Sequence, residues 1–379
     1  MNFANPQKAK SLSDTLLFLP PSSIPTHHPS FSCQNGDNEP DIRNYCHVFY
    51  VGIMLDTIEI KRIMKGTKSS HLQNVLDTHS MSHIDELIEK YREKRNTVKE
   101  FLEDHYKSQI YNPINSGSIK KATAINNKFD FDVVAPFKYD SFETLEMMFN
   151  DVFEELYEEY KDVATVRKQK VSIGIEFFED EDNDVISLDI VPGRELNEDQ
   201  YSDDNKLNLY VNSRYGTIEE KSYIQTNIQA QIDHIKGKDN ERTIIKLLKI
   251  WKSTNGEDFK SFLIELISIK AFDKTEIAGN LWEKLKSVMN YIESNITTEG
   301  FTLTDPGNSN NDVMDSISED DRKYLSDKME LIVRRIEENE NNIDSYFPIN
   351  EEFGEDEESY GIKGSTIAIS TPSNNERFG

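Results

Sequence analysis

The sequence predicts an α+β fold whose second half is helical, and three observations carry this prediction. Apolar and polar residues alternate with the strand period of two in short runs at 129–134, 171–177 and 185–191. Amphipathic helical patterns flank these runs, and from about residue 216 the pattern becomes helical throughout. With 379 residues, of which 36% are hydrophobic, the chain is long enough for two domains with buried cores.

Along the chain, residues 1–75 combine many prolines with little periodicity, which predicts a poorly ordered extension. A helix is predicted from Ser82, where Ser82 and Asp85 form a capping signature, and it should end before Pro113. Strand 129–134 follows, and the next helix carries apolar residues from Phe142 to Leu156 on one face.

The remaining elements follow the same logic. Strands 171–177 and 185–191 form a hairpin around an acidic turn at 179–184. Helices are expected near 218–236, 240–253, 257–271, 275–295 and 318–338. We therefore expect domains at 80–215 and 216–340, followed by a flexible acidic tail at 341–379.

Charge and cysteine content restrict the function. The 69 Asp and Glu outnumber the 43 Lys and Arg, so the net charge of −26 argues against extended binding of nucleic acid and against an anionic membrane surface. A small anion such as a nucleotide needs only a local pocket. The two cysteines, Cys33 and Cys46, provide no disulfide framework, which predicts a cytoplasmic protein. No apolar run approaches the roughly 20 residues of a membrane span.

Three aspartates form the most informative pattern. Because Phe129, Phe131 and Val133 face a core, Asp130 and Asp132 must share the opposite face of one strand, about 7 Å apart. Asp189 is the one charge on its face of the later strand 185–191. Carboxylates held so close repel unless a divalent cation binds them, and oxygen ligands suit Mg²⁺ that bridges substrate phosphates. Such acidic pairs also occur on solvated surfaces.

The pair Gly117-Ser118 lies in a predicted turn before the first of these strands. Glycine lets backbone N–H groups approach phosphate oxygens, and the serine hydroxyl can donate one more hydrogen bond. On its own such a turn is a weak signal for phosphate binding.

These segments together resemble the cGAS/DncV-like nucleotidyltransferases of bacterial anti-phage signalling. The resemblance rests on Gly117-Ser118, the segment 121–125, Phe129 to Val134 and Leu188 to Gly193, and it continues through 247–252, 260–266 and 305–313. Ala122 departs from the family, in which glycine is common there. The resemblance implies a polymerase-β-like palm with a C-terminal helical domain, and it covers roughly residues 80–340.

The resemblance also implies an activity and a set of site residues. Asp130, Asp132 and Asp189 would bind two Mg²⁺ ions, with Mn²⁺ as an alternative, and the enzyme would join nucleoside triphosphates into a cyclic di- or oligonucleotide that acts on a downstream effector. Lys249 and Ser261 would contact the triphosphate, although Lys249 also fits a solvated lysine stripe with Lys246 and Lys252. Phe262 either stacks on a base or joins the core.

Two alternatives and one further site remain open at the sequence level. A nucleotidyltransferase with a protein or RNA acceptor is the second hypothesis, and a nucleotide-binding module without activity is the third. The chain ends at Gly379 after a stretch that predicts a mobile tail. Because some members of the family are joined through their C-terminal residue by a ubiquitin-like conjugation system, Gly379 is a candidate conjugation site.

Overall fold

The computed structural model describes residues 67–212 and 223–354, which belong to one compact unit of the chain. Most of the predicted extension, the end of the predicted tail and Gly379 therefore lie outside the described residues. Among the helices within the described ranges, none is long and apolar enough to cross a membrane.

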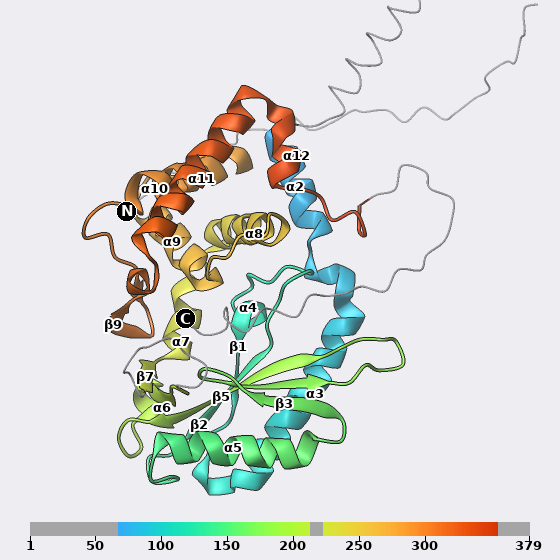
Figure 1. Cartoon of the computed structure of the whole chain (residues 1–379), viewed down its shortest axis with the longest axis vertical. Coiled ribbons are helices and arrows are strands. Elements are labelled where there is room, and N and C mark those ends of the chain that lie inside the picture. The colour runs from blue at the N-terminus through green and yellow to red at the C-terminus, as the bar shows by residue number, and fades with distance from the viewer. Residues whose placement is uncertain (1–66, 213–222, 355–379) are drawn as a thin grey trace, which may run out of the picture. The chain divides into compact units, whose positions relative to one another are not determined.

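Strands of the first half form a mixed sheet, which confirms the α+β prediction (Figure 1). Within the described residues it has seven strands, in the order β1-β2-β5-β4-β3, with β6 beside β5 and β7 beside β6. Among these described strands, only the pair β2 and β5 is parallel. The strands are β1 Ile114–Ser116, β2 Asp132–Phe137, β3 Ala164–Lys168, β4 Ile173–Phe177, β5 Ser187–Glu195, β6 Leu207–Tyr210 and β7 Tyr223–Thr226.

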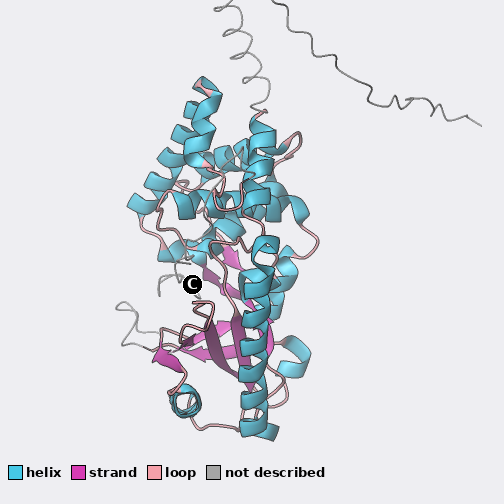
Figure 2. Ribbon diagram, turned by 90° about the vertical axis from the view of Figure 1, so that its right-hand side faces the viewer, coloured by secondary structure: helices cyan, strands magenta, loops and turns pink. Residues whose placement is uncertain are grey.

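Helices α3 (Asp85–Tyr106) and α5 (Leu145–Tyr160) cover one face of this sheet, and Figure 2 shows the long α3 running beside the strands. Their apolar side chains bury a core with Val133, Leu188 and Ile190. Since strand side chains alternate between faces, Asp132 and Asp189 point to the other face, away from α3 and α5. The two helices thus bury one face of the sheet, and the two carboxylates lie on the opposite face.

The helical half has its own core, built around Trp251. Its helices are α7 Ile228–Ile235, α8 Asp239–Thr254, α9 Ser261–Lys274, α10 Leu281–Asn295 and α11 Glu319–Glu338. Asn280 begins α10 with a capping box to Glu283, so this helix starts six residues later than predicted. The predicted helices at 240–253 and 318–338 are confirmed as α8 and α11, and β4 and β5 confirm the hairpin. The helix predicted at 257–271 is present as α9 but begins only at Ser261.

Two local predictions are wrong. Ser82 does not cap a helix, because Ser80 accepts a hydrogen bond from the backbone of Ser82 and starts a 3₁₀ turn, Met81–Ile84, before α3 begins. The helix predicted at 218–236 contains strand β7, whose aromatic and β-branched residues pair with β6. Asn227 then caps α7, so the helix begins only at Ile228.

The helical core extends beyond the boundaries that the periodicity predicts. Helix α2 (Lys68–Thr78) falls partly within the predicted extension, and Leu72 and Val75 are fully buried in the helical core. At the other end, α12 (Ile343–Tyr346) and the buried Phe347 lie within the predicted tail. In these segments a few apolar side chains dock onto a large core, and so few give only a weak periodic signal.

The segment 305–313, which carries part of the resemblance, folds as the hairpin of β8 (Thr304–Asp305) and β9 (Asn308–Asp312), followed by a 3₁₀ turn. The carboxylate of Asp305 accepts hydrogen bonds from Gln231 on α7 and from the backbone of Gly307. Asn308 donates to the carbonyl oxygen of Gln225. This segment therefore connects the helical half to the last strand of the sheet.

Candidate active site

Two of the three predicted carboxylates lie side by side in the sheet. Asp132 begins β2, and the parallel register pairs it with Asp189 on β5. Paired residues point to the same face, so both carboxylates stand on the face opposite the α3 and α5 core. Both side chains are buried, Asp189 with only 1% exposure. Two buried carboxylates in neighbouring positions destabilise each other's ionised form unless a cation or hydrogen-bond donors compensate the charge.

Asp130 lies two residues before β2, outside the sheet ladder. Its backbone N–H donates to the hydroxyl of Ser118, with a distance of 3.1 Å between nitrogen and oxygen. Among the described residues, the acids whose ligand atoms all lie within 4.8 Å of one another are Asp180, Asp182 and Asp184, so Asp130, Asp132 and Asp189 do not form so tight a group. The structure therefore brings Asp132 and Asp189 together. The prediction that Asp130 and Asp132 share one face of a strand over 129–134 is wrong, because the strand begins only at Asp132.

Gly117 cannot be replaced without disturbing these carboxylates. It begins the short helix α4 (Gly117–Lys120), where a turn was predicted, with a φ of +82°. A Cβ on this residue would lie 2.7 Å from the carbonyl oxygen of Asp130 and 2.7 Å from Oδ2 of Asp132. Both the backbone conformation and the close approach therefore require glycine. The Gly-Ser pair is thus in direct contact with the acidic residues.

Lys249 reaches the loop that follows α4. Its ammonium donates to the carbonyl oxygen of Thr123 at 3.1 Å and to the Thr123 hydroxyl at 3.2 Å. Burial lowers the pKa of Lys249 from 10.5 to about 8, although the charges of Asp130 and Glu265 act to raise it. Lys249 is 8% exposed and Lys252 is 2% exposed, so a solvated lysine stripe is the wrong interpretation for these two residues.

Ser261 and Phe262 lie at the start of α9, next to further lysines. The ammonium of Lys252 is 3.5 Å from the Ser261 hydroxyl. Phe262 packs partly buried against the helical core, and the ammonium of Lys121 stands 4.9 Å from its ring centre. Lys121 therefore makes a cation–π contact with the Phe262 ring.

A buried ion pair that had no role in the sequence interpretation joins the two halves. Lys121 and Glu265 are 2.9 Å apart and nearly fully buried. A single acid within the apolar run from Phe262 to Leu266 is the signal that predicts such a pair, because a charge in a buried helix face needs a partner.

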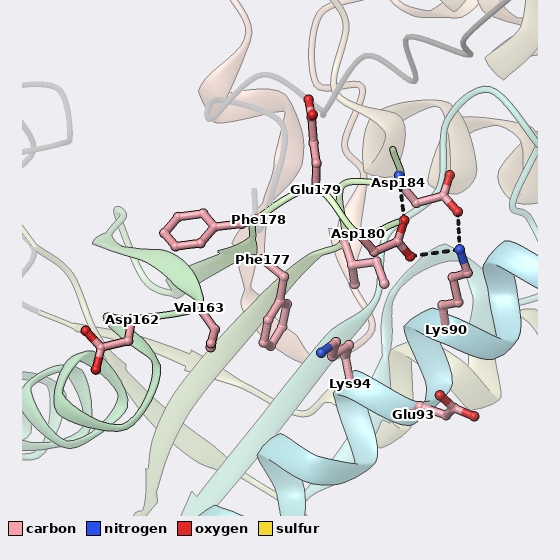
Figure 3. A pocket seen from close by; sticks show the side chains of 11 residues that line it. Lys90, Glu93, Lys94, Asp162, Val163, Phe177, Phe178, Glu179, Asp180 and Asp184 are labelled. Atoms are coloured by element: carbon pink, nitrogen blue, oxygen red, sulfur yellow. Dashed lines mark hydrogen bonds and ion pairs between the residues drawn. The ribbon is translucent and has the colours of Figure 1, made fainter. Parts of the chain in front are cut away.

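A second acidic cluster lies in the loop between β4 and β5, beside a pocket of about 490 Å³ (Figure 3). Asp180, Asp182 and Asp184 offer ligand atoms close enough to hold a cation. The ammonium of Lys90 from α3 already contacts all three, at 2.8, 2.5 and 2.7 Å. These contacts raise the pKa of Lys90 well above its usual range and lower the pKa of Asp180. In this structure a lysine provides the positive charge of the cluster.

Comparison with known proteins identifies the fold. The chain matches no protein-family model. It is 24% identical to the cyclic AMP-AMP-AMP synthase of Escherichia coli over 234 residues, which are 58% of this chain and 68% of that enzyme. The structure of Escherichia coli CdnC with ATP is similar with a TM-score of 0.55 and 20% identity, covering 70% of this chain and 91% of that one. The chain has the fold of the cGAS/DncV-like nucleotidyltransferases.

Two further structures share this fold. The CD-NTase CdnG of Bradyrhizobium diazoefficiens in complex with GTP has a TM-score of 0.57 and 13% identity, over 74% of this chain and 95% of that one. CdnC in its complex with HORMA-deltaN has a TM-score of 0.55 and 20% identity, over 71% of this chain and 90% of that one. The polymerase-β-like palm with a C-terminal helical domain is thereby confirmed as the fold of this chain.

Proposed function

We propose that this chain is a nucleotidyltransferase that joins ribonucleoside triphosphates into a cyclic di- or oligonucleotide and releases pyrophosphate. The observation that carries the proposal is the pair Asp132 and Asp189, adjacent on parallel strands and approached by Gly117. The similarity to a cyclic AMP-AMP-AMP synthase, and to structures that hold ATP or GTP, supports the same activity. The cyclic product would act on a downstream effector in anti-phage defence, as the resemblance implies.

The acidic residues suit Mg²⁺. Asp132 and Asp189 offer neighbouring carboxylates on one face, and Gly117 keeps the space above Oδ2 of Asp132 free of a side chain. Asp130, Asp132 and Asp189 would hold two Mg²⁺ ions, or Mn²⁺ in their place. When bound, the ions neutralise charge on the reacting phosphate and lower the pKa of the attacking hydroxyl.

The residues of the chain supply binding and proton transfer. Asp189 accepts the proton of the attacking ribose hydroxyl. The backbone N–H groups at Gly117 and the hydroxyl of Ser118 bind phosphate oxygens, for which the Ser118 hydroxyl still has a proton to donate while it accepts from Asp130. Lys249 exchanges its bonds to Thr123 for the triphosphate, Ser261 adds a hydroxyl, and Phe262 contacts a base with the part of its ring that Lys121 leaves exposed.

One experiment separates the competing functions. The purified full chain is incubated with each labelled nucleoside triphosphate, singly and in mixtures, with Mg²⁺ and with a protein or RNA acceptor present or absent. Nuclease-resistant cyclic product that requires no acceptor supports the proposal. Label transferred to a protein or to RNA would instead favour the acceptor-modifying alternative, and no turnover under any condition would favour a binding module. Asp132→Asn is the matched negative control.

The remaining parts of the proposal are the cellular location of the reaction and the role of Gly379, which lies outside the described residues. We place the reaction in the cytoplasm, because the two cysteines form no disulfide framework. We keep Gly379 as a candidate conjugation site for a ubiquitin-like system, since a glycine carboxylate is sterically easy to activate. Deleting the last few residues should leave synthesis intact in vitro and remove protection in cells, whereas unchanged protection would exclude conjugation as a requirement.

A further inference from the structure

Gln169 contacts the third carboxylate of the proposed site. It lies in the turn between β3 and β4, which its backbone N–H closes by donating to the carbonyl oxygen of Ser172 at 2.8 Å. The Gln169 side chain is 5% exposed. Its amide nitrogen donates to Oδ1 of Asp189 at 3.0 Å, and the Ser172 hydroxyl donates to its amide oxygen at 2.8 Å. Both ends of the amide are therefore held in place.

The charge of Asp189 determines which way the amide points. An ionised carboxylate only accepts hydrogen bonds, so the amide nitrogen must face Asp189 and the amide oxygen must face Ser172, which donates. The resulting chain of bonds from Ser172 through Gln169 fixes one oxygen of Asp189. Because the amide is neutral, it orients the carboxylate without neutralising its charge. Lys90 has the opposite effect on Asp180, Asp182 and Asp184, where it supplies a full positive charge.

Gly174 makes room for this amide. The antiparallel register pairs Gly174 on β4 with Asp189 on β5, so a side chain at either position points to the same face. A Cβ on Gly174 would lie 2.5 Å from the amide nitrogen of Gln169. The missing side chain thus creates the space in which the amide reaches Asp189. Since the group in the way is the end of a flexible side chain, an alanine at 174 would displace the amide and leave the strand intact.

We propose that Gln169 is a positioning residue that holds the Asp189 carboxylate in the orientation required to bind a divalent cation and accept the hydroxyl proton. Gly174 and Ser172 make this contact possible. The cation-binding part stands on the contacts of Asp189, and only the part about proton transfer rests on the proposed function. Partners that orient metal ligands in this way typically change metal affinity or activity by about ten- to hundredfold when removed.

The test uses the full chain and two variants that break the same contact by different means. Gln169→Met keeps the length of the side chain and removes the donor, whereas Gly174→Ala keeps Gln169 and displaces it. Gln73→Met is the matched control, because Gln73 donates to Asp77 at 2.9 Å on the exposed surface of α2. Mn²⁺ binding without nucleotide is measured by electron paramagnetic resonance, and kcat and KM are measured with the triphosphates that the wild type uses.

We expect both variants to weaken Mn²⁺ binding by about ten- to hundredfold and to lower kcat by a similar factor, with KM for the triphosphate changed less than about twofold. The double variant should be no worse than the worse single variant, because both changes remove one contact. Gln73→Met should match the wild type. Full additivity of the two losses, or wild-type Mn²⁺ affinity in both single variants, would overturn the proposal.

The two levels of the proposal fail in different ways. If the wild type forms no product but Mn²⁺ affinity falls in both variants, the positioning role is supported and the proposed synthase activity is wrong. If the wild type forms cyclic product and both variants keep its Mn²⁺ affinity and kcat, the activity is supported and the role of Gln169 is wrong.

Discussion

Two groups of aspartates in this chain have similar composition and different surroundings. Asp180, Asp182 and Asp184 lie on a loop and share the ammonium of Lys90. Figure 3 shows Asp180 and Asp184 beside Lys90. Asp132 and Asp189 lie buried on adjacent strands, where Gly117 approaches Asp132 and the neutral amide of Gln169 donates to Asp189. Lys90 compensates the negative charge of the loop cluster, and these ion pairs attach the loop to α3. The sheet pair presents carboxylate oxygens on one face of two core strands, and such oxygen ligands suit a divalent cation.

The difference shows that acidic spacing alone does not define a metal site. The loop cluster contains aspartates at spacing i, i+2, and Asp130 and Asp132 have the same spacing, although only Asp132 lies in the sheet pair. What separates them is the burial of the carboxylates and the rigidity of the element that carries each of them. The loop cluster is largely exposed, so each of its ion pairs alone contributes little to the free energy of unfolding, whereas the sheet pair is held by the register of two core strands.

The largest effect is expected for the three aspartates of the proposed active site. Asp130→Asn, Asp132→Asn and Asp189→Asn should each abolish product, a loss of more than about a hundredfold, because each removes a ligand charge. Their melting temperatures should not fall, since each change also relieves repulsion between acids. Product formation and thermal melting are the measurements.

Asp182→Asn is the matched control in the loop cluster and should keep activity within about twofold. If Asp182→Asn removed activity and one of the three sheet-side variants retained it, the roles of the two groups would be reversed.

The sequence could predict the candidate site only in part. The alternation around Phe131 correctly places Asp132 away from the core, and the alternation of Leu188 and Ile190 does the same for Asp189. Their parallel register depends on a pairing between segments far apart in the chain, which no local pattern encodes. For the same reason the sequence could not separate the loop cluster from the sheet pair, because Lys90 lies about ninety residues from the acids that it contacts.

The fold was predictable where a pattern is long. Helices α8 and α11 each carry a sustained apolar stripe, and both were expected close to their true bounds. Helix α12 has only four residues. It is stabilised because Ile343, and Phe347 directly after the helix, are buried against a core formed by distant helices. Gln169 likewise has no sequence signal, because its role depends on the space left by Gly174 on the next strand.

The next effect concerns Lys249 on α8, which donates to Thr123 and is influenced by the charge of Asp130. Lys249→Ala should raise the apparent KM for triphosphate about tenfold, since a charged hydrogen bond to phosphate is lost. The pKa of Lys249 is lowered to about 8, so its charge disappears as the pH rises through 8 and the wild-type KM should rise over the same range. Steady-state kinetics from pH 7 to 9 measure both effects.

Two variants on α8 control for this result. Lys249→Arg stays charged throughout, so its KM should not rise above pH 8. Lys246→Ala, one turn earlier, should leave KM within about twofold. In the wild type the unfolded chain binds more protons at this lysine between pH 8 and 10.5, so the contribution of Lys249 to the free energy of unfolding increases with pH there. A KM that is independent of pH in the wild type would contradict a charged contact of Lys249 with the triphosphate.

A smaller effect is expected at the loop cluster, where Lys90→Met removes the cation. The three carboxylates then repel one another, and the melting temperature should fall by a few degrees at low ionic strength. Added Ca²⁺ or high salt should restore it, because either compensates the repulsion. Synthesis by Lys90→Met at 25 °C should equal that of the wild type.

The wild type provides the control for Lys90→Met, since its melting temperature should not respond to Ca²⁺ while Lys90 occupies the cluster. A loss of activity in Lys90→Met at a temperature where the variant is folded would mean that the loop cluster belongs to the active site after all.

The smallest effect tests whether backbone strain, besides charge, distinguishes the sheet site. Ala122, next to the Thr123 that binds Lys249, has a φ of 58°, a conformation that favours glycine. Ala122→Gly should raise the free energy of unfolding by at most about 1 kcal/mol, because relief of strain exceeds the added entropy of the unfolded chain. Ala124→Gly, two residues on, is buried and has no such strain, so it should lower the same quantity by about 0.5–1 kcal/mol. Denaturant unfolding measures both, and equal losses in the two variants would show that the loop stores no strain at Ala122.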